Sequence, residues 1–119
     1  MGRILVVVND LLMGSKIREA VKAAGHDAVF CASADKAGDA LAGGAVDLVL
    51  ADLSPRGADP IPALEILKKG SLAAVPMVGY YSHVDDATRQ RAHAAGVQAL
   101  PRSAFFGDLA GLIEKSTGG

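Results

Sequence analysis

Short runs of aliphatic and β-branched residues recur along the chain and are separated by longer stretches of mixed polarity. The runs at Ile4–Val8 and Val46–Ala51 are nearly continuous, which is typical of strands covered on both faces of a parallel sheet. The runs at Ala28–Cys31 and Val97–Leu100 are shorter and less apolar, as edge strands are. Together with the run at Val75–Tyr80, they predict five strands, of which the first and third are central.

The stretch after each run repeats apolar or small residues at intervals of three or four positions. This spacing places them on one face of a helix, so we predict five helices. The repeats are Ile17, Val21 and Ala24; Ala37 and Leu41; Ile61, Leu64 and Leu67; Thr88, Ala92 and Ala95; and Phe105, Leu109, Leu112 and Ile113.

Strands that alternate with helices through short connections imply right-handed crossovers and a parallel sheet. We therefore predict an α/β fold of the flavodoxin-like class. It has a doubly wound five-stranded parallel sheet in the order 2-1-3-4-5 and five helices. Residues 1–119 are expected to form a single domain, with residues 116–119 as a frayed tail.

The amino-acid composition argues against some classes of binding partner. Twelve Lys and Arg against 13 Asp and Glu give a net charge of −1, which lacks the basic excess of a nucleic-acid-binding protein. No apolar run approaches the ~20 residues that a membrane-spanning helix needs. The single cysteine, Cys31, cannot form an intrachain disulfide, which favours a reducing compartment. We therefore expect a cytoplasmic protein that binds neither nucleic acid nor membranes.

The predicted topology selects one edge of the sheet as the functional site. In open α/β sheets, ligands bind beyond the carboxyl ends of the strands, at the switch point between strands 1 and 3. No glycine-rich phosphate loop follows the first strand, which argues against a nucleotide-binding enzyme. The polar residues that follow strands 1, 3, 4 and 5 form the predicted switch-point pocket: Asn9, Asp10, Asp52, Tyr81, Ser82 and Arg102.

The chain resembles the receiver domain of two-component response regulators over essentially its whole length. The resemblance rests on the apolar first strand, on Asp52 after the third, on Ala95-Gly96 before the fifth, and on a basic residue after Leu100-Pro101. It implies that Asp52 is the phosphoacceptor position, which receives a phosphoryl group from a histidine kinase. It also implies that two acids after strand 1 hold Mg²⁺. A Thr or Ser after strand 4 and a Lys after strand 5 would bind the phosphoryl oxygens.

Matched residue by residue, the metal-binding positions of that family are altered. The acid pair falls on Val8 and Asn9, with Asp10 one place beyond, whereas Asp52 is unchanged. Mg²⁺ is usually held by one or two carboxylates together with phosphate and water. The loss of acids from this set predicts weak metal binding, and phosphoryl transfer without the cation loses a main source of charge neutralisation.

The phosphoryl-binding positions are altered as well. The Thr or Ser position falls on Tyr81, next to Ser82, and the Lys position falls on Arg102. A guanidinium suits a bidentate pair with a carboxylate. We therefore hypothesise that Arg102 pairs directly with Asp52 in place of metal and phosphate.

These substitutions favour a pseudo-receiver, which signals by protein contact, is not an enzyme and needs no phosphorylation and no cofactor. We expect its partner to be a histidine kinase or a downstream effector, and the protein itself to be a monomer or a weak homodimer. The face made by the fourth helix, the fifth strand and the fifth helix is the expected contact surface, with Tyr80, His83 and Phe106 on it.

Two alternatives belong to other functional classes. The first is a working single-domain response regulator that accepts phosphate from a histidine kinase on Asp52, with Mg²⁺ held by Asn9, Asp10 and Asp52. The second is a flavodoxin-like protein that binds a small anion in the crevice. Uptake of a phosphoryl group in the presence of Mg²⁺ separates the first alternative from the pseudo-receiver.

Overall fold

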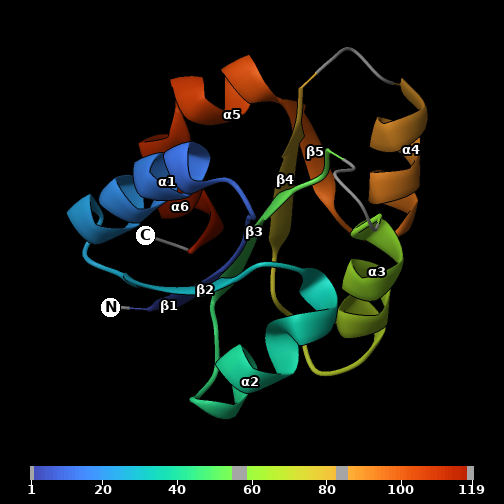
Figure 1. The fold of residues 1–119 in the computed structure, drawn as a ribbon, viewed down its shortest axis with the longest axis horizontal. Helices are drawn as coiled ribbons and strands as arrows, with labels where there is room; N and C mark the ends of the chain where they lie inside the picture. Colours follow the sequence, from blue (N-terminus) through green and yellow to red (C-terminus); the bar gives the residue numbers. More distant parts are fainter. Residues whose placement is uncertain (1, 55–58, 83–85, 118–119) are drawn as a thin grey trace.

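A parallel sheet forms the centre of the molecule. The computed structural model describes residues 2–54, 59–82 and 86–117. The strands are β1 (Arg3–Val7), β2 (Asp27–Cys31), β3 (Leu48–Asp52), β4 (Met77–Tyr81) and β5 (Gln98–Pro101). They lie in the order β2-β1-β3-β4-β5, and every neighbouring pair is parallel (Figure 1). The predicted fold class and strand order are therefore confirmed.

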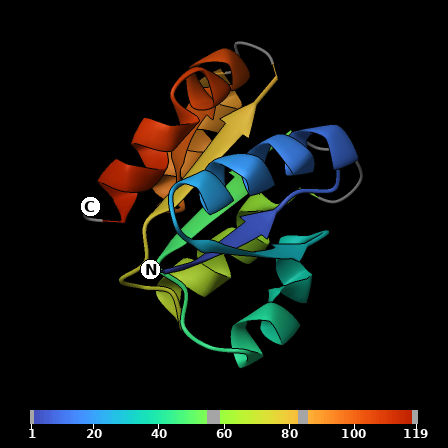
Figure 2. The same cartoon turned by 90° about the vertical axis from the view of Figure 1, so that its left-hand side faces the viewer.

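Helices cover both faces of this sheet. They are α1 (Leu11–Ala23), α2 (Ala37–Ala42), α3 (Ile61–Lys69), α4 (Asp86–Ala94), α5 (Arg102–Gly107) and α6 (Leu109–Ser116), with a 3₁₀ turn, η1 (Ala34–Lys36), before α2. Helices α1, α5 and α6 lie on one face and α2, α3 and α4 on the other (Figures 1 and 2).

The core consists of two apolar clusters, one on each face of the sheet. Because successive side chains of a strand point to opposite faces, Ile4 and Val6 pack on the side of α1 and α6. Leu5 and Val7 pack on the side of α2, α3 and α4. These four side chains are almost completely buried, which explains why the first apolar run is continuous rather than alternating.

The prediction of five helices is wrong at the C-terminal end, where the fifth helix is split in two. Gly107 has a low helix propensity, and Asp108 leaves the helical conformation with φ −142° and ψ 45°. The Asp108 carbonyl then accepts a hydrogen bond from the Leu112 amide and starts α6. Ser116, the first residue of the expected frayed tail, is the last residue of α6. Residues 118–119 lie outside the described residues.

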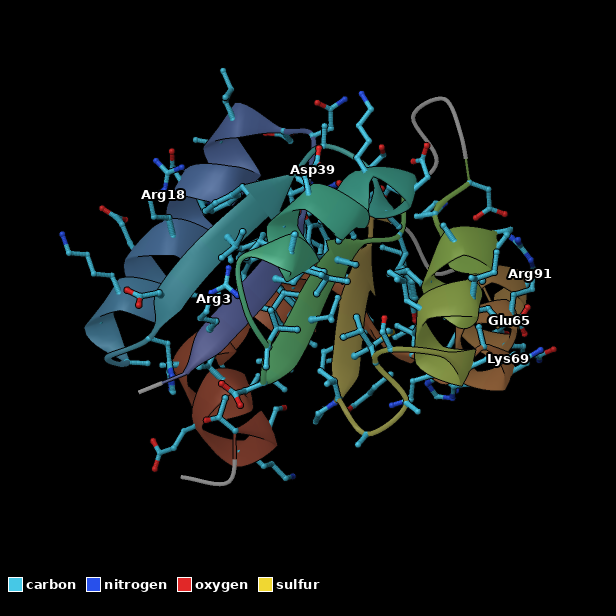
Figure 3. All side chains as sticks on the ribbon, turned by 90° about the horizontal axis from the view of Figure 1, so that it is seen from below. Arg3, Arg18, Asp39, Glu65, Lys69 and Arg91 are labelled. Atoms are coloured by element: carbon cyan, nitrogen blue, oxygen red, sulfur yellow. The ribbon has the colours of Figure 1, made fainter. Side chains whose placement is uncertain are left out.

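Two of the strands begin later than the apolar runs predict. The fourth begins at Met77 because Pro76 has no amide proton for the ladder, although its carbonyl accepts from the Val49 amide. The third begins at Leu48, after Asp47, whose carboxylate accepts a hydrogen bond from the Arg3 amide at 3.0 Å. The Arg3 guanidinium in turn donates to the carbonyl at the end of α2 (Figure 3).

Gly79 lies where β4 passes closest to the segment after β3. A Cβ atom on this residue would lie 2.6 Å from Cγ and 2.7 Å from Cδ1 of Leu53. The Leu53 side chain is itself only 1% exposed. Glycine at this position therefore allows the end of β3, which carries the candidate site, to lie close against β4.

No helix in the described part of the chain is long and apolar enough to cross a membrane.

Candidate functional site

Asp52 is the last residue of β3 and lies half-buried at the carboxyl edge of the sheet. Its Oδ1 accepts a hydrogen bond from the Ser54 amide at 2.8 Å, which turns the chain away from the strand. The Ser54 and Ser82 hydroxyls lie 3.0 Å apart and form a hydrogen bond. The ends of β3 and β4 are thus joined beside the carboxylate.

The structure brings part of the predicted switch-point pocket together. Asn9, Asp10 and Asp52 line a pocket of about 210 Å³ between the ends of β1, β2 and β3. Two further acids, Asp35 and Asp59, line the same pocket. The predicted meeting of β1 and β3 residues is therefore present, but the pocket carries more carboxylates than the strand ends alone indicated.

The residues after β4 and β5 line a different pocket, although the Ser82 hydroxyl is hydrogen-bonded to that of Ser54 beside Asp52. Ser82 and Arg102 line a separate, wider groove of about 520 Å³ between α1 and α5, together with Lys16 and Phe106. Arg102 and Asp52 both belong to the described part of the chain, and the structure forms no ion pair between them. The hypothesised bidentate pair is therefore absent. Arg102 is instead an exposed residue at the start of α5 that lines the groove.

The metal-ligand set of the alternative prediction does not fit a preformed Mg²⁺ site. Oδ1 of Asp10 accepts hydrogen bonds from the amides of Leu12 (2.9 Å) and Met13 (3.1 Å), so Asp10 is the N-cap of α1. Asn9 is exposed and uncharged. No group of three or more His, Cys, Asp or Glu side chains within residues 2–54, 59–82 and 86–117 is arranged to hold a metal ion.

Tyr80, rather than Tyr81, is the tyrosine on the side of Asp52. Tyr80 pairs with Asp52 across β3 and β4, and paired residues of neighbouring parallel strands face the same side of the sheet. Strand alternation places Tyr81 on the opposite face. Both tyrosines are buried, with 2% of Tyr80 and 6% of Tyr81 exposed. Tyr80 is therefore a site residue that the sequence placed on the partner surface.

The Tyr80 hydroxyl is buried and forms no hydrogen bond with any described residue. Its pKa is raised above the ordinary value, mainly by burial, then by the negative charges of Asp52 and Asp10 and by the Asp52 carboxylate as a hydrogen-bond acceptor, while Arg102 opposes the shift. The Asp52 carboxylate thus acts on the hydroxyl through its charge and as a nearby acceptor, although the two groups do not form a hydrogen bond of regular geometry. The phenol remains protonated at any physiological pH.

Fewer residues of the predicted partner surface are exposed than the sequence indicated. The rings of Tyr80, Phe105 and Phe106 contact one another, with centroids 4.8 to 5.1 Å apart. Of the three, only Phe106 is partly exposed, so Tyr80 cannot contact a partner as predicted. His83 lies outside the described residues. Among the described residues, the large apolar side chains that are most exposed are Leu11 (94%), Ile66 (72%) and Leu12 (64%).

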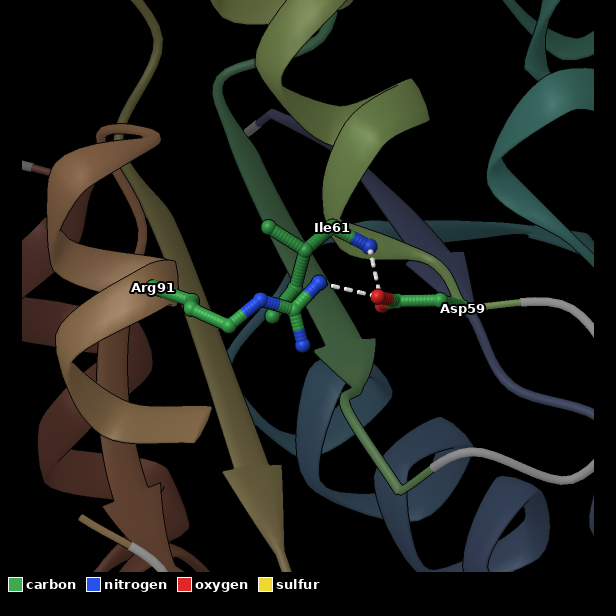
Figure 4. Close-up of polar contacts among 3 residues, drawn as sticks. All are labelled: Asp59, Ile61 and Arg91. Atoms are coloured by element: carbon green, nitrogen blue, oxygen red, sulfur yellow. Dashed lines mark hydrogen bonds and ion pairs between the residues drawn. The ribbon is translucent and has the colours of Figure 1, made fainter. Parts of the chain in front are cut away.

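A further polar contact joins the pocket to α4 (Figure 4). One carboxylate oxygen of Asp59 accepts a hydrogen bond from the Ile61 amide at 3.1 Å, and the other pairs with the Arg91 guanidinium of α4. Burial acts to raise the pKa of Asp59, but these hydrogen bonds and the charge of Arg91 outweigh burial and lower it. Arg91 lies beside α3, near the pair that Glu65 and Lys69 form along that helix (Figure 3).

No protein-family model matches this sequence, and no curated protein matches it. The fold of this chain does resemble those of solved structures. A response regulator from Thermotoga maritima has a TM-score of 0.84 at 14% identity, covering 100% of this chain and 99% of that one. The chemotaxis response regulator CheY4 of Vibrio cholerae has a TM-score of 0.83 at 14% identity, with 98% of each chain covered. NtrX from Brucella abortus has a TM-score of 0.85 at 22% identity over 98% of this chain. The chain spans only 27% of the NtrX chain.

These similarities establish that the chain has the fold of a response regulator receiver domain. The sequence resemblance to receivers is thus matched by the three-dimensional structure. At identities of 14% to 22%, the similarity shows the fold alone, and the function depends on the chemistry of the site.

Proposed function

We propose that this chain is a receiver-type signalling module that acts by contact with a partner protein and needs no phosphoryl group on Asp52. The observation that carries the proposal is that neither of the two polar residues that follow β1, Asn9 and Asp10, is available as a charged metal ligand beside Asp52. Asp10 is engaged as the cap of α1, and Asn9 is exposed and brings no charge. Asp52 therefore lacks the organised carboxylates that would hold a divalent cation beside it.

Without such a cation, transfer of a phosphoryl group to Asp52 is electrostatically unfavourable. The donor is an anion, and among the described residues the pocket it would enter is lined by four carboxylates, those of Asp10, Asp35, Asp52 and Asp59, and by one cation, Lys36, while Asp59 is paired with Arg91 of α4. Charge neutralisation by metal ions is a principal source of catalysis in phosphoryl transfer. We therefore expect the unmodified protein to be the signalling form, a cytoplasmic and non-enzymatic module.

The surface between α1 and α5 is the most suitable contact site for a partner. Leu12 is an exposed apolar side chain at the start of α1, one helical turn before Lys16, and Lys16 lines the adjoining groove with Phe106 and Arg102. Exposed apolar groups beside cations are typical of surfaces that bind protein segments with apolar and acidic side chains. A histidine kinase or a downstream effector with such a segment is the proposed partner.

Intact-mass measurement tests the phosphorylation-independent function. The protein is incubated with Mg²⁺ and acetyl phosphate, and its mass is compared with that of Asp52→Asn and Asp35→Asn treated in the same way. We expect no stable gain of a phosphoryl group in any of the three. A gain in the wild type and in Asp35→Asn that is absent from Asp52→Asn would refute the proposal.

The second candidate function is that of a working single-domain response regulator, and one observation favours it. The Asp52 carboxylate lines an open pocket, and its neighbours there include Asn9 and Asp10. If Mg²⁺ draws Asp10 away from the helix cap, these oxygens would approach the metal together. The same mass experiment supports this candidate if modification depends on both Mg²⁺ and Asp52.

The contact surface has its own test. Leu12→Ser should weaken binding to the partner, because it removes an apolar group that is 64% exposed, lies one helical turn before Lys16 and contributes little to the core. Ile66→Ser is the matched control, since Ile66 is also exposed but lies on α3, on the other face of the sheet. Equal binding by both variants would exclude the α1–α5 surface.

A further inference from the structure

The hydroxyl of Tyr80 is a buried polar group that forms no regular hydrogen bond within the described part of the chain. The residue is 2% exposed, and the hydroxyl oxygen has no hydrogen-bond partner among the described residues. Buried polar groups are almost always hydrogen-bonded, so each exception calls for an explanation. An aromatic core position can be filled by phenylalanine without this cost, and the two neighbouring rings, Phe105 and Phe106, are both phenylalanine.

The Asp52 carboxylate is the group positioned to interact with this hydroxyl. The two residues are paired across β3 and β4 and face the same side of the sheet. Only one hydrogen bond reaches the carboxylate within the described residues, from the Ser54 amide to Oδ1. Burial raises the pKa of Tyr80 most, and the charges of Asp52 and then Asp10, followed by the Asp52 carboxylate as a hydrogen-bond acceptor, raise it further. The phenol therefore keeps its proton and remains a potential donor next to a charged acceptor.

The ring of Tyr80 connects this hydroxyl to the protein surface. Its centroid lies 4.8 Å from that of Phe105 and 5.1 Å from that of Phe106. Phe105 is fully buried, whereas Phe106 is partly exposed and lines the groove between α1 and α5. The ammonium of Lys16 lies 5.8 Å from the centre of the Phe106 ring. Close-packed interiors transmit small displacements, because the rings have no free space to absorb them.

We propose that Tyr80 is a positioning residue that couples the charge of Asp52 to the orientation of Phe106. When the Asp52 carboxylate is ionised, it attracts the phenolic proton. When its charge is neutralised by protonation, substitution or modification, that attraction is lost and the phenol moves. The Phe106 ring then follows, because it packs edge-on against the ring of Tyr80 at an interplanar angle of 64°.

The direction of this coupling follows from strand alternation. Asp52 and Tyr80 face α1, α5 and α6, so the effect reaches the groove between α1 and α5 and bypasses α4. The inference rests on the proposed function in one respect only, namely that a partner protein contacts Phe106 and responds to the orientation of its ring. The coupling itself is a property of the free protein, whether or not a phosphoryl group ever reaches Asp52.

Tyrosine fluorescence provides a direct test, because the chain contains two tyrosines and no tryptophan. Tyr81→Phe leaves Tyr80 as the sole tyrosine. Adding Asp52→Asn to that protein should increase its emission, because a nearby carboxylate quenches an excited phenol. In the matched control, Tyr80→Phe leaves Tyr81 as the sole tyrosine, and Asp52→Asn should leave its emission unchanged. Equal responses in the two backgrounds, or none in either, would overturn the proposal.

The second measurement follows the ring of Phe106 itself. We expect Asp52→Asn to shift the aromatic NMR resonances of Phe106 in the wild-type background, and the shift to be lost when Tyr80 is replaced by Phe. A shift of the same size in both backgrounds would mean that the effect bypasses the Tyr80 hydroxyl and would refute the coupling. Amide spectra confirm that each conservative variant is folded. Phosphorylation detected by mass would refute the proposed function while leaving these two results unaffected.

Discussion

Replacement of Gly79 by alanine tests whether β4 and the end of β3 lie as close as the structure indicates. The added Cβ would lie 2.6, 2.7 and 3.0 Å from three atoms of the Leu53 side chain. Normal carbon contacts are about 3.5 to 4.0 Å, so the two groups must separate by about 1 Å. Because one of the three is the branch-point Cγ and the side chain is buried, a rotation of terminal methyl groups cannot relieve the contact.

The expected cost follows from two opposing effects. Overpacking of a well-packed core typically costs about 1–3 kcal/mol. Replacing glycine by alanine at a compatible backbone conformation recovers about 0.4–1 kcal/mol, because the unfolded chain loses freedom. Gly79→Ala should therefore lower the free energy of unfolding by about 1–2 kcal/mol, measured by urea denaturation followed by circular dichroism.

Gly38 provides the matched control. It lies within α2, and a Cβ there meets no atom within 4 Å. Gly38→Ala should raise the free energy of unfolding by up to about 1 kcal/mol, as alanine does in helices. In a double-mutant cycle, Leu53→Ala should cost less in the Gly79→Ala protein than in the wild type. A Gly79→Ala protein as stable as the wild type would refute the close approach of β4 to Leu53.

Three further predictions concern single side chains. The pKa of Asp59 in the folded protein lies below its ordinary value of 3.8. Its pairing with Arg91 therefore stabilises the fold fully at pH values above 3.8, and this stabilisation is lost as the pH falls through the lowered pKa of the folded state. Arg91→Gln should thus cost less than about 1 kcal/mol at pH 7, and denaturation curves in strong acid should show no difference from the wild type. Asp10→Ala should cost about 0.5–2 kcal/mol in urea denaturation, whereas Asp10→Asn should cost much less because asparagine caps helices equally well; equal costs would contradict the capping role. Burial, and secondarily the charge of Asp35, raise the pKa of the Cys31 thiol, so alkylation at pH 8 should be slower in the folded protein than in urea, and equal rates would count against this environment.

The hydrophobic pattern was sufficient to predict the sheet. The central strands are buried on both faces, so their continuous apolar runs identify them directly, and the crossover rules then leave few possible strand orders. The break between α5 and α6 was missed because Gly107 and Asp108 lie inside an otherwise regular apolar stripe. Such a stripe shows which face is buried and carries little information about a local change of direction.

The site was predictable in outline but not in its contacts. Topology placed Asp52 beside the end of β1, and that placement depends only on strand order. The assignment of Tyr80 depended on register, in which an error of one residue moves a side chain to the opposite face of a strand. Asp59 and Arg91 are 32 residues apart and belong to no shared pattern, so only the folded structure reveals their ion pair.

The unequal charge of the pocket beside Asp52 has a consequence for small molecules in the surrounding solution. Among its described lining residues the cavity has four aspartates and one lysine, and Asp59 is paired with Arg91 outside the lining, so these residues give it a negative potential that repels approaching anions and enriches mobile cations near its mouth. Dissolved salt weakens this field over a Debye length of about 8 Å at physiological ionic strength. Encounters with anionic metabolites should therefore become more frequent as ionic strength rises, whereas contacts made at the cationic groove between α1 and α5 should become weaker.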